Sequence, residues 1–204
     1  MKEFWDERYR QEGYVYGKEP NQYLKEKLLP LTPKRILFPL DGEGRNGVYA
    51  ANLGWEVTSF DQSTAAQAKA QKLAKERHVT LNYLVSDFED ISFPSNSFDA
   101  IALIFAHFSA EKRKLAHQNL NSFLKKDGFL IIEGFSTKHL DYQKKYPHIG
   151  GPREINMLYE LEALKQDFPN FQWIEATETI VDLNEGNYHK GQGSVVRVFA
   201  KKEI

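Results

Sequence analysis

Short apolar runs alternate along the first two thirds of the chain with segments in which apolar residues recur at helical spacing. The apolar runs are nearly continuous, which is typical of parallel strands that are buried on both faces of a sheet. Because helical segments separate these runs, the pattern predicts βαβ units and a parallel sheet. The five predicted strands are RILFP, EVTSFD, TLNYLVS, FDAIALIFA and FLIIEGF, which begin at residues 35, 56, 80, 98 and 129.

The helical segments begin at residues that can cap a helix and carry one apolar face. Ser63 and Ser109 stand where helices would start, and their hydroxyls can accept free backbone N–H groups of the first turn. After the fourth strand, four apolar residues at i, i+4, i+7 and i+8 predict a face packed on the sheet. These residues are Ala116, Leu120, Phe123 and Leu124.

The pattern changes after the fifth strand. Residues 136–154 predict a long irregular loop, and residues 155–168 predict a helix. Two further apolar runs, FQWIEATETIVDL and GSVVRVFAKK, are joined by NEGNYHKGQ, which is too short for a parallel crossover. We therefore predict a Rossmann-like three-layer α/β/α sandwich, with a mostly parallel seven-stranded sheet that ends in an antiparallel C-terminal hairpin.

Length and composition predict a single ordinary globular domain. Of the 204 residues, 41% are hydrophobic and 27% are charged, which suits one packed core. We expect an N-terminal lid segment (1–33), a cofactor-binding core (34–135) and a C-terminal part (136–204) with a lid loop, a helix and the hairpin. The absence of cysteine excludes thiolate metal sites and a cysteine nucleophile.

Charge and hydropathy restrict the partners that we expect. The formal net charge is -1 and no basic stripe occurs, so a nucleic-acid partner is not expected. No apolar stretch approaches the roughly 20 residues of a membrane span, and the charged start MKEFWDERYR lacks a secretory apolar run. We expect a cytoplasmic protein with a small-molecule partner and no nucleic acid, membrane or obligate protein partner.

A glycine-rich turn follows the first predicted strand, at the sheet edge where such folds bind ligands. Gly42, Gly44 and Gly47 have the spacing G-x-G-x-x-G, which in dinucleotide-binding proteins cradles a pyrophosphate. Asp61 ends the second strand, 17 positions after Gly44, and can accept both hydroxyls of a ribose. NAD and S-adenosylmethionine both carry this ribose, so these residues leave both cofactors open.

Nearby carboxylates favour S-adenosylmethionine. Asp41 and Glu43 flank the first glycine, and each would repel a pyrophosphate about 4 Å away by roughly 4 kcal/mol at an effective dielectric near 20. S-adenosylmethionine has no phosphate and carries a sulfonium and an ammonium, which these carboxylates would attract. Asp87, after the third strand, can accept a hydrogen bond from an adenine amino group while Phe88 packs on the ring.

The motifs together resemble the class I S-adenosylmethionine-dependent methyltransferases. The resemblance lies in ILFPLDGEGRN, VTSFDQS, LVSDFEDISFPSNSFDAIALIF and LKKDGFLIIEGF, within residues 34–135, and the C-terminal hairpin extends it. The opening FWDERYRQEGYVYGKEPNQYL and the GEGRN loop are similar to the small tellurite-resistance and thiopurine-methyltransferase-like branch. The resemblance implies that S-adenosyl-L-methionine is bound by Tyr16, Leu40, Asp41, Gly42, Gly44, Asn46, Asp61, Gln62, Asp87, Phe88 and Phe105.

Two positions depart from the family pattern. The usual acidic residue of the first strand is Phe38, and the first glycine of the usual G-x-G-x-G is Leu40. Asp41 is a candidate to supply the missing acidity.

Methyl transfer from a sulfonium needs alignment of donor and acceptor rather than a metal. His107, just after the fourth strand, is the candidate catalytic base or substrate contact; the alternative is a histidine packed beneath the next helix. His189 in the hairpin could reach the same rim, and the alternative there is a solvated turn. Trp5, Tyr14 and Tyr16 are candidates for an aromatic lid over the sulfonium, where a ring gains about 0.5–2 kcal/mol from a cation.

The segment Ser136–Glu154 predicts a second lid, because structureless connections of this length are uncommon. It holds Tyr142, Tyr146, His139 and His148, and Gly150-Gly151-Pro152 could act as a hinge. An aromatic and nearly neutral lid suits a small soft acceptor such as a thiol or a chalcogen anion.

We therefore expect methyl transfer to a small molecule. One alternative is an NAD(P)-dependent oxidoreductase, which the literal glycine spacing favours. Another is a donor-binding domain without catalysis, which Phe38 and Leu40 favour.

Overall fold

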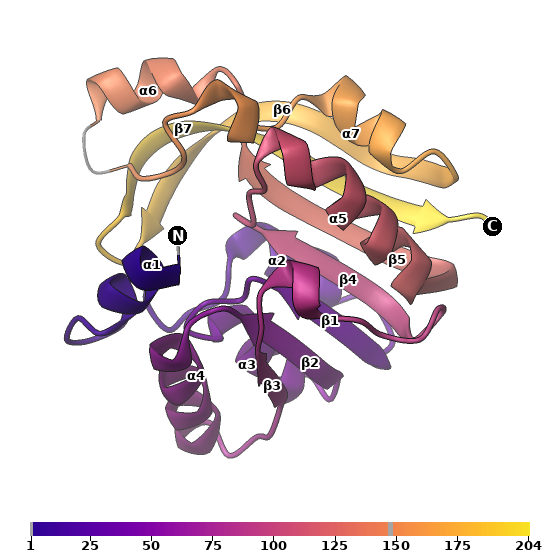
Figure 1. The fold of residues 1–204 in the computed structure, drawn as a ribbon, viewed down its shortest axis with the longest axis horizontal. Coiled ribbons are helices and arrows are strands. Elements are labelled where there is room, and N and C mark those ends of the chain that lie inside the picture. The colour runs from indigo at the N-terminus through magenta and orange to yellow at the C-terminus, as the bar shows by residue number, and fades with distance from the viewer. Residues whose placement is uncertain (1, 147–148) are drawn as a thin grey trace.

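The computed structural model describes residues 2–146 and 149–204. In these residues seven strands form one sheet in the order β3-β2-β1-β4-β5-β7-β6 (Figure 1). The first five strands pair in parallel, and β7 pairs antiparallel with both β5 and β6, which confirms the predicted fold class. The strands are β1 (Arg35–Pro39), β2 (Glu56–Asp61), β3 (Asn82–Val85), β4 (Phe98–Ile104), β5 (Leu124–Phe135), β6 (Phe171–Glu185) and β7 (His189–Lys202).

Helices lie on both faces of the sheet (Figure 1). Successive residues of β1 belong to different cores: Leu37 packs with residues of α5 and α7, whereas Ile36 and Phe38 pack with residues of α2 and α3. Since alternate strand residues point to opposite faces, a strand buried on both faces must be apolar throughout. The helices are α1 (Lys2–Tyr9), α2 (Gln22–Leu28), α3 (Arg45–Asn52), α4 (Thr64–Glu76), η1 (Phe88–Asp90), α5 (Ala110–Phe123), α6 (His139–Lys145), η2 (Ile155–Met157) and α7 (Leu161–Asp167).

The predicted face of α5 is confirmed, and one of the two predicted caps is wrong. Ala116, Leu120 and Phe123 are buried in the core, with Leu124 already the first residue of β5. Ser63 caps α4, because its Oγ accepts the Ala66 N–H at 3.1 Å. Ser109 precedes α5 without a side-chain capping bond.

Residues 136–168 differ from the predicted loop and helix. His139 begins α6 and stacks on Phe135 with ring centroids 3.8 Å apart, so tertiary packing orders part of the predicted loop. The predicted helix is divided into η2 and α7. The reason is Tyr159, whose N–H donates to the Phe135 carbonyl and whose carbonyl accepts the Thr137 N–H, so that its backbone extends the end of β5.

The C-terminal hairpin is longer than predicted and reaches the N-terminal segment. Its pairing continues to Glu185 and His189, which leaves residues 186–188 as the turn. The N–H of Asn187 in this turn donates to the Val15 carbonyl at 2.8 Å, and Figure 1 shows the hairpin curving down beside α1. The turn of the C-terminal hairpin therefore contacts the N-terminal segment at one side of the sheet.

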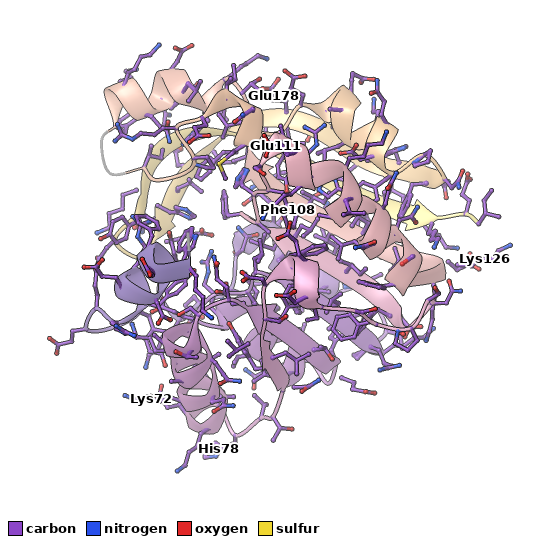
Figure 2. All side chains as sticks on the ribbon, in the orientation of Figure 1. Lys72, His78, Phe108, Glu111, Lys126 and Glu178 are labelled. Carbon is purple, nitrogen blue, oxygen red and sulfur yellow. The ribbon has the colours of Figure 1, made fainter. Side chains whose placement is uncertain are left out.

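Charged side chains of both signs lie at the periphery. Lys72, Lys126 and Glu178 are exposed examples on α4, in β5 and in β6 (Figure 2). None of the described helices is both long and apolar enough to cross a membrane.

Candidate active site

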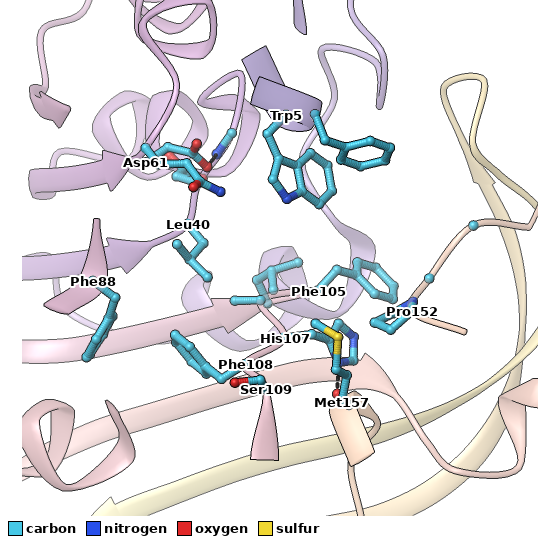
Figure 3. A pocket seen from close by; sticks show the side chains of 18 of the residues that line it. Trp5, Leu40, Asp61, Phe88, Phe105, His107, Phe108, Ser109, Pro152 and Met157 are labelled. Atoms are coloured by element: carbon cyan, nitrogen blue, oxygen red, sulfur yellow. Dashed lines mark hydrogen bonds between the residues drawn. The ribbon is translucent and has the colours of Figure 1, made fainter. Parts of the chain in front are cut away.

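A cavity of about 1190 Å³ opens at the carboxyl ends of the parallel strands (Figure 3). Its lining comes from the turns after β1, β2, β3 and β4, from α1 and α5, from the loop after α6, and from the hairpin. The chain adds β2 and β3 on one side of β1 and β4 and β5 on the other, so the order of connection reverses at β1. The crevice at such a switch point is where this fold class binds ligands.

Most residues that the sequence analysis selected do line this cavity. Gly44 is the exception among the eleven candidates for donor binding, and the catalytic candidate His107 is also part of the wall. The ten candidates in the lining are Tyr16, Leu40, Asp41, Gly42, Asn46, Asp61, Gln62, Asp87, Phe88 and Phe105.

The glycines of the turn are required by backbone conformation and by close packing. Gly42 and Gly44 have positive φ values of 53° and 78°. A Cβ on Gly44 would overlap the Ala70 side chain of α4, so this glycine lets α3 and α4 approach behind the cavity. Leu40 stands where the family usually has glycine and adopts φ 53°, a left-handed conformation that costs a non-glycine residue about 1–3 kcal/mol.

Asp41 and Glu43 both line the cavity, but one oxygen of Asp41 and both oxygens of Glu43 already bond to the protein, which the electrostatic argument from the sequence did not foresee. Asp41 Oδ2 accepts the Gly47 N–H at 3.2 Å and the Ser59 hydroxyl at 2.8 Å, so Asp41 caps α3. Burial raises the pKa of Asp41 to about 7. Glu43 accepts the Val15 N–H at 2.7 Å and pairs with Lys69 at 2.8 Å, which ties the N-terminal segment to the turn.

Asp61 joins the glycine turn to the start of α4. Its Oδ2 accepts the Gly42 N–H and its Oδ1 accepts the Ser63 N–H, both at 3.1 Å. Burial raises the pKa of Asp61 to about 6, although these backbone bonds oppose the shift. Each carboxylate oxygen has a second lone pair, so the side chain can still accept a hydroxyl from a ligand in the cavity.

The predicted adenine contacts are Asp87, directly before η1, and Phe88, its first residue. Asp87 is exposed at the cavity rim. The Phe88 ring packs 5.9 Å from that of Phe60 and 5.0 Å from that of Phe108, centroid to centroid. Phe108, just before α5, was missed by the sequence analysis although it follows the fourth strand closely. Phe88 and Phe108 form an aromatic corner at this end of the cavity (Figure 3).

His107 uses both ring nitrogens to hold backbone groups. Nδ1 lies 2.9 Å from the Met157 carbonyl and therefore donates, and Nε2 accepts the Phe135 N–H at 3.2 Å (Figure 3). Burial lowers the pKa of His107 to about 4. The ring is thus neutral and engaged, and this geometry favours the packing alternative over the role of a base.

His189 is buried in the cavity wall, so its placement in a solvated turn is wrong. Its Nδ1 bonds Glu185 Oε2 at 3.1 Å, and its ring lies 4.4 Å from Phe105 and 4.7 Å from Tyr16, centroid to centroid. Glu185 also pairs with Arg45 at 2.8 Å. This wall connects the hairpin, the turn after β4 and the first residue of α3.

The N-terminal lid has different members from those predicted. Trp5 and Tyr16 line the cavity, whereas the Tyr14 hydroxyl donates to the Lys69 carbonyl on the outside of α4. Asp6 fastens α1 to α4 through bonds from the Ser63 hydroxyl and the Ala65 N–H. Arg8 was missed, and its spacing of i+3 from Trp5 on a helix would have revealed it.

The second predicted lid is anchored on its inner side. Gly150, Gly151 and Pro152 line the cavity, and Gln143 Nε2 donates to the carbonyls of all three. His139, the first residue of α6, is buried. Tyr142 and Tyr146 do not line the cavity, and His148 lies outside the described residues. None of the aromatic residues that line the cavity comes from the described part of residues 136–154.

Metal-ligand clusters do not occur in the described part of the chain. Among residues 2–146 and 149–204, no three histidine, aspartate or glutamate side chains are grouped so that they could hold a metal ion.

Comparison with known proteins identifies the class. Residues 41–132 match the methyltransferase domain family. The glycine/sarcosine N-methyltransferase of Aphanothece halophytica is 31% identical over 53% of this chain and 47% of that protein. The probable S-adenosyl-L-methionine-dependent methyltransferase TehB of Haemophilus influenzae is 20% identical over 76% of this chain and 52% of that protein. The chain thus spans about half the length of these curated relatives.

Solved structures agree with this assignment at the level of the fold. The crystal structure of TehB from Haemophilus influenzae has a TM-score of 0.72 at 17% identity and matches 99% of this chain and 67% of that chain. A structure solved for the conversion of a disulfide bond into a thioacetal group during echinomycin biosynthesis has a TM-score of 0.78 at 18% identity, over 100% of this chain and 92% of that chain.

The Rossmann-like fold is shared with the solved structure of TehB. In sequence the chain is similar to class I S-adenosylmethionine-dependent methyltransferases, including the TehB-like branch.

Proposed function

We propose that this protein transfers the methyl group of S-adenosylmethionine to a small-molecule acceptor inside the cavity. The observation that carries the proposal is the position of Asp61. Its carboxylate ends β2 at the cavity and holds the glycine turn of β1, where it can accept the ribose hydroxyls of the donor. Gln62, Asp87 and Phe88 extend this wall and would hold the adenosine part of the donor.

The opposite wall would receive the acceptor. It consists of Trp5 and Tyr16 from the N-terminal segment, Phe105 after β4, His189 of the hairpin and Met157 of η2. This wall is aromatic, and its histidine is neutral because burial lowers the pKa of His189. In-line displacement at a sulfonium requires the acceptor atom to be held close to the methyl group while water is excluded, and positioning of this kind can supply about 7–11 kcal/mol.

We infer that the acceptor is a soft nucleophile, such as a thiol or a chalcogen anion. Such an atom can be deprotonated at neutral pH and needs no general base, which suits a cavity in which the candidate base His107 has both ring nitrogens engaged. One structure of the same fold was solved for the conversion of a disulfide bond into a thioacetal group, which is a sulfur chemistry of the kind proposed here.

Calorimetric titration with S-adenosylmethionine, S-adenosylhomocysteine, NAD and NADP tests the cofactor. We expect micromolar binding of the first two and negligible binding of the nicotinamide nucleotides. Binding of NAD or NADP without binding of either sulfur nucleoside would overturn the proposal in favour of an oxidoreductase.

A panel of thiols, selenite, tellurite and catechols tests the acceptor, with S-adenosylhomocysteine as the measured product. We expect product with a thiol or chalcogen compound. Turnover of a catechol alone would contradict the soft-acceptor assignment. Donor binding without product from any compound would instead favour the non-catalytic alternative that the strained Leu40 raises.

A further inference from the structure

Arg8 places a positive charge at the cavity without a carboxylate partner among the described residues. It projects from α1, is half-buried and lines the cavity. The Nη1 atom donates to the Tyr16 hydroxyl at 3.3 Å, which uses one of the five N–H groups of a guanidinium. Of the other cations that line the cavity, Arg45 is paired with Glu185 and Lys112 with Glu89, whereas Lys2 and Arg153 are exposed to solvent.

Aromatic rings hold the Arg8 guanidinium in place. Its central carbon lies 4.5 Å from the ring centroid of Phe4, 5.4 Å from that of Trp5 and 4.4 Å from that of Tyr188. Rings attract a cation but leave its in-plane N–H groups without acceptors. A planar fork of free donors that is fixed by stacking is the arrangement that binds a carboxylate through two parallel hydrogen bonds.

Nearby acidic side chains are already used by other groups. Asp6, on the same helix, bonds Arg10 and the start of α4. Glu185, in the hairpin, bonds Arg45, His189 and the Asn21 amide. Removing a cation from water is unfavourable unless an opposite charge or good hydrogen bonds replace the water, so the missing counter-charge points to a ligand.

We propose that Arg8 is the carboxylate-binding residue of the cavity. The carboxylate comes from one of two molecules that would meet there, the α-carboxylate of the donor's methionine part or an acid group on the acceptor. The assignment rests on the proposed function, since both molecules are the substrates of methyl transfer.

Arg8→Met tests the assignment, because methionine retains an unbranched apolar chain and removes the charged fork. Arg8→Lys keeps the charge without the planar fork. Arg77→Met, at an exposed ion pair directly after α4, is the control for loss of one positive charge. Calorimetry compares S-adenosylhomocysteine with 5′-methylthioadenosine, which keeps the nucleoside thioether and lacks the amino-acid carboxylate. With S-adenosylhomocysteine bound, mercaptoacetate is then compared with 2-mercaptoethanol.

If the donor supplies the carboxylate, Arg8→Met should weaken S-adenosylhomocysteine binding at least tenfold and change 5′-methylthioadenosine binding less than twofold. If the acceptor supplies the carboxylate, Arg8→Met should weaken the binding of mercaptoacetate at least tenfold, and mercaptoacetate should be the one probe so affected. In both cases the affinity of Arg8→Lys should lie between those of Arg8→Met and the wild type. The affinity of Arg77→Met should match that of the wild type. Equal affinities of wild type and Arg8→Met for all four probes would overturn the assignment. A wild type that binds S-adenosylhomocysteine but forms no methylated product would contradict the proposed function and leave the Arg8 result standing.

Discussion

Arg45 and Glu185, which are 140 positions apart in the chain, form a buried ion pair with 2.8 Å between Nη2 and Oε2. Arg45 is the first residue of α3, directly after the glycine turn, and Glu185 is the last residue of β6. Through Glu185 the pair also contacts His189 and Asn21. The donor side of the cavity is therefore fastened to the hairpin that forms the opposite wall.

Replacing Glu185 should destabilise the protein strongly. Glu185→Ala leaves Arg45 buried without its counter-charge, and breaking a buried pair in this way costs about 3–5 kcal/mol. Urea unfolding at neutral pH measures the change. The control is Glu56→Ala, which removes an exposed pair with Arg35 and should cost about 1 kcal/mol or less. Equal losses in the two variants would contradict a structural role for the buried pair.

The same carboxylate gives stability that depends on acid. The neighbouring Arg45 charge and the hydrogen bonds from His189 and Arg45 outweigh burial and lower the pKa of Glu185 to about 2, from an ordinary value of 4.5. A group whose pKa is lowered in the folded protein contributes its full stabilisation at pH values above its pKa in the unfolded chain. This contribution is lost as the pH falls from about 4.5 toward about 2. The difference in unfolding free energy between wild type and Glu185→Gln should shrink over that range. A difference that does not change with pH would contradict the assignment.

Asp41 should make the stability of the protein change with pH in the opposite direction. Because burial raises its pKa to about 7, the folded protein retains a proton that the unfolded chain releases near the ordinary value of 3.8. Its contribution therefore becomes less favourable as the pH rises from about 4 to about 7 and is constant above. Asp61 shifts in the same direction, so Asp41→Asn should reduce this slope without abolishing it. Urea unfolding of both proteins between pH 4.5 and pH 8 measures the slopes, and identical slopes would show that Asp41 does not carry the proton.

Gly44→Ala should be more damaging than Gly54→Ala. Both glycines have positive φ, so both variants introduce backbone strain. Only at Gly44 would the new Cβ overlap Ala70, whereas at Gly54 the nearest atom is a Pro33 carbon 3.9 Å away. Overpacking adds about 1–3 kcal/mol, which thermal unfolding of the two variants should resolve. Gly44→Ala should also weaken S-adenosylhomocysteine binding, and Gly54→Ala should not.

Asp61→Asn should weaken donor binding by about 1.5–3 kcal/mol, because charge-assisted hydrogen bonds to the ribose become neutral ones or are lost. Asparagine is the better test than alanine here. Its single side-chain oxygen can still accept one of the two buried N–H groups, those of Gly42 and Ser63, whereas alanine would leave both without an acceptor and destabilise the fold more. Calorimetry with S-adenosylhomocysteine gives the affinity, with the exposed Asp90→Asn as control. An unchanged affinity would mean that Asp61 has only the structural role.

His107→Ala should lower turnover less than tenfold on a soft acceptor, measured per folded molecule. Its nitrogens hold the Met157 carbonyl and the Phe135 N–H, so some loss of stability is expected. The pH–rate profile of the wild type should lack a histidine limb near pH 6.5, because burial keeps this ring neutral with a pKa of about 4. A loss of about 10²–10⁴ in turnover would instead identify His107 as a base.

Much of the fold was predictable because its signals are local. The continuous apolar runs of β1, β2 and β4 predicted parallel strands buried on both faces, and the short C-terminal connection predicted an antiparallel hairpin. The positions of Asp61 and Asp87 at the cavity followed as well, since residues after parallel strands meet at one edge of the sheet.

Residues 136–168 were harder to predict because long-range contacts decide their structure. His139 orders α6 by stacking on Phe135, and Tyr159 interrupts the predicted helix by pairing with the end of β5. Phe135 is only four positions before His139, but it is 24 positions before Tyr159, and α6 also packs on β7. Local propensity is a weak guide where tertiary contacts of this kind form.

The sequence by itself determined the class of fold, the edge of the sheet at which the cavity lies and many of the residues that line it. Only the tertiary structure decided what each polar group does there. Asp41, Glu43 and His107 looked available from the sequence, and each is engaged by backbone groups that distant segments or the adjoining helix bring to it. Arg8 was not among the residues that the sequence singled out, and it is held at the cavity by Tyr16 and Tyr188 without an ion pair among the described residues. The physical reason is that periodicity reports which face of an element is buried, whereas the availability of a donor or an acceptor depends on which partners the packed chain places beside it.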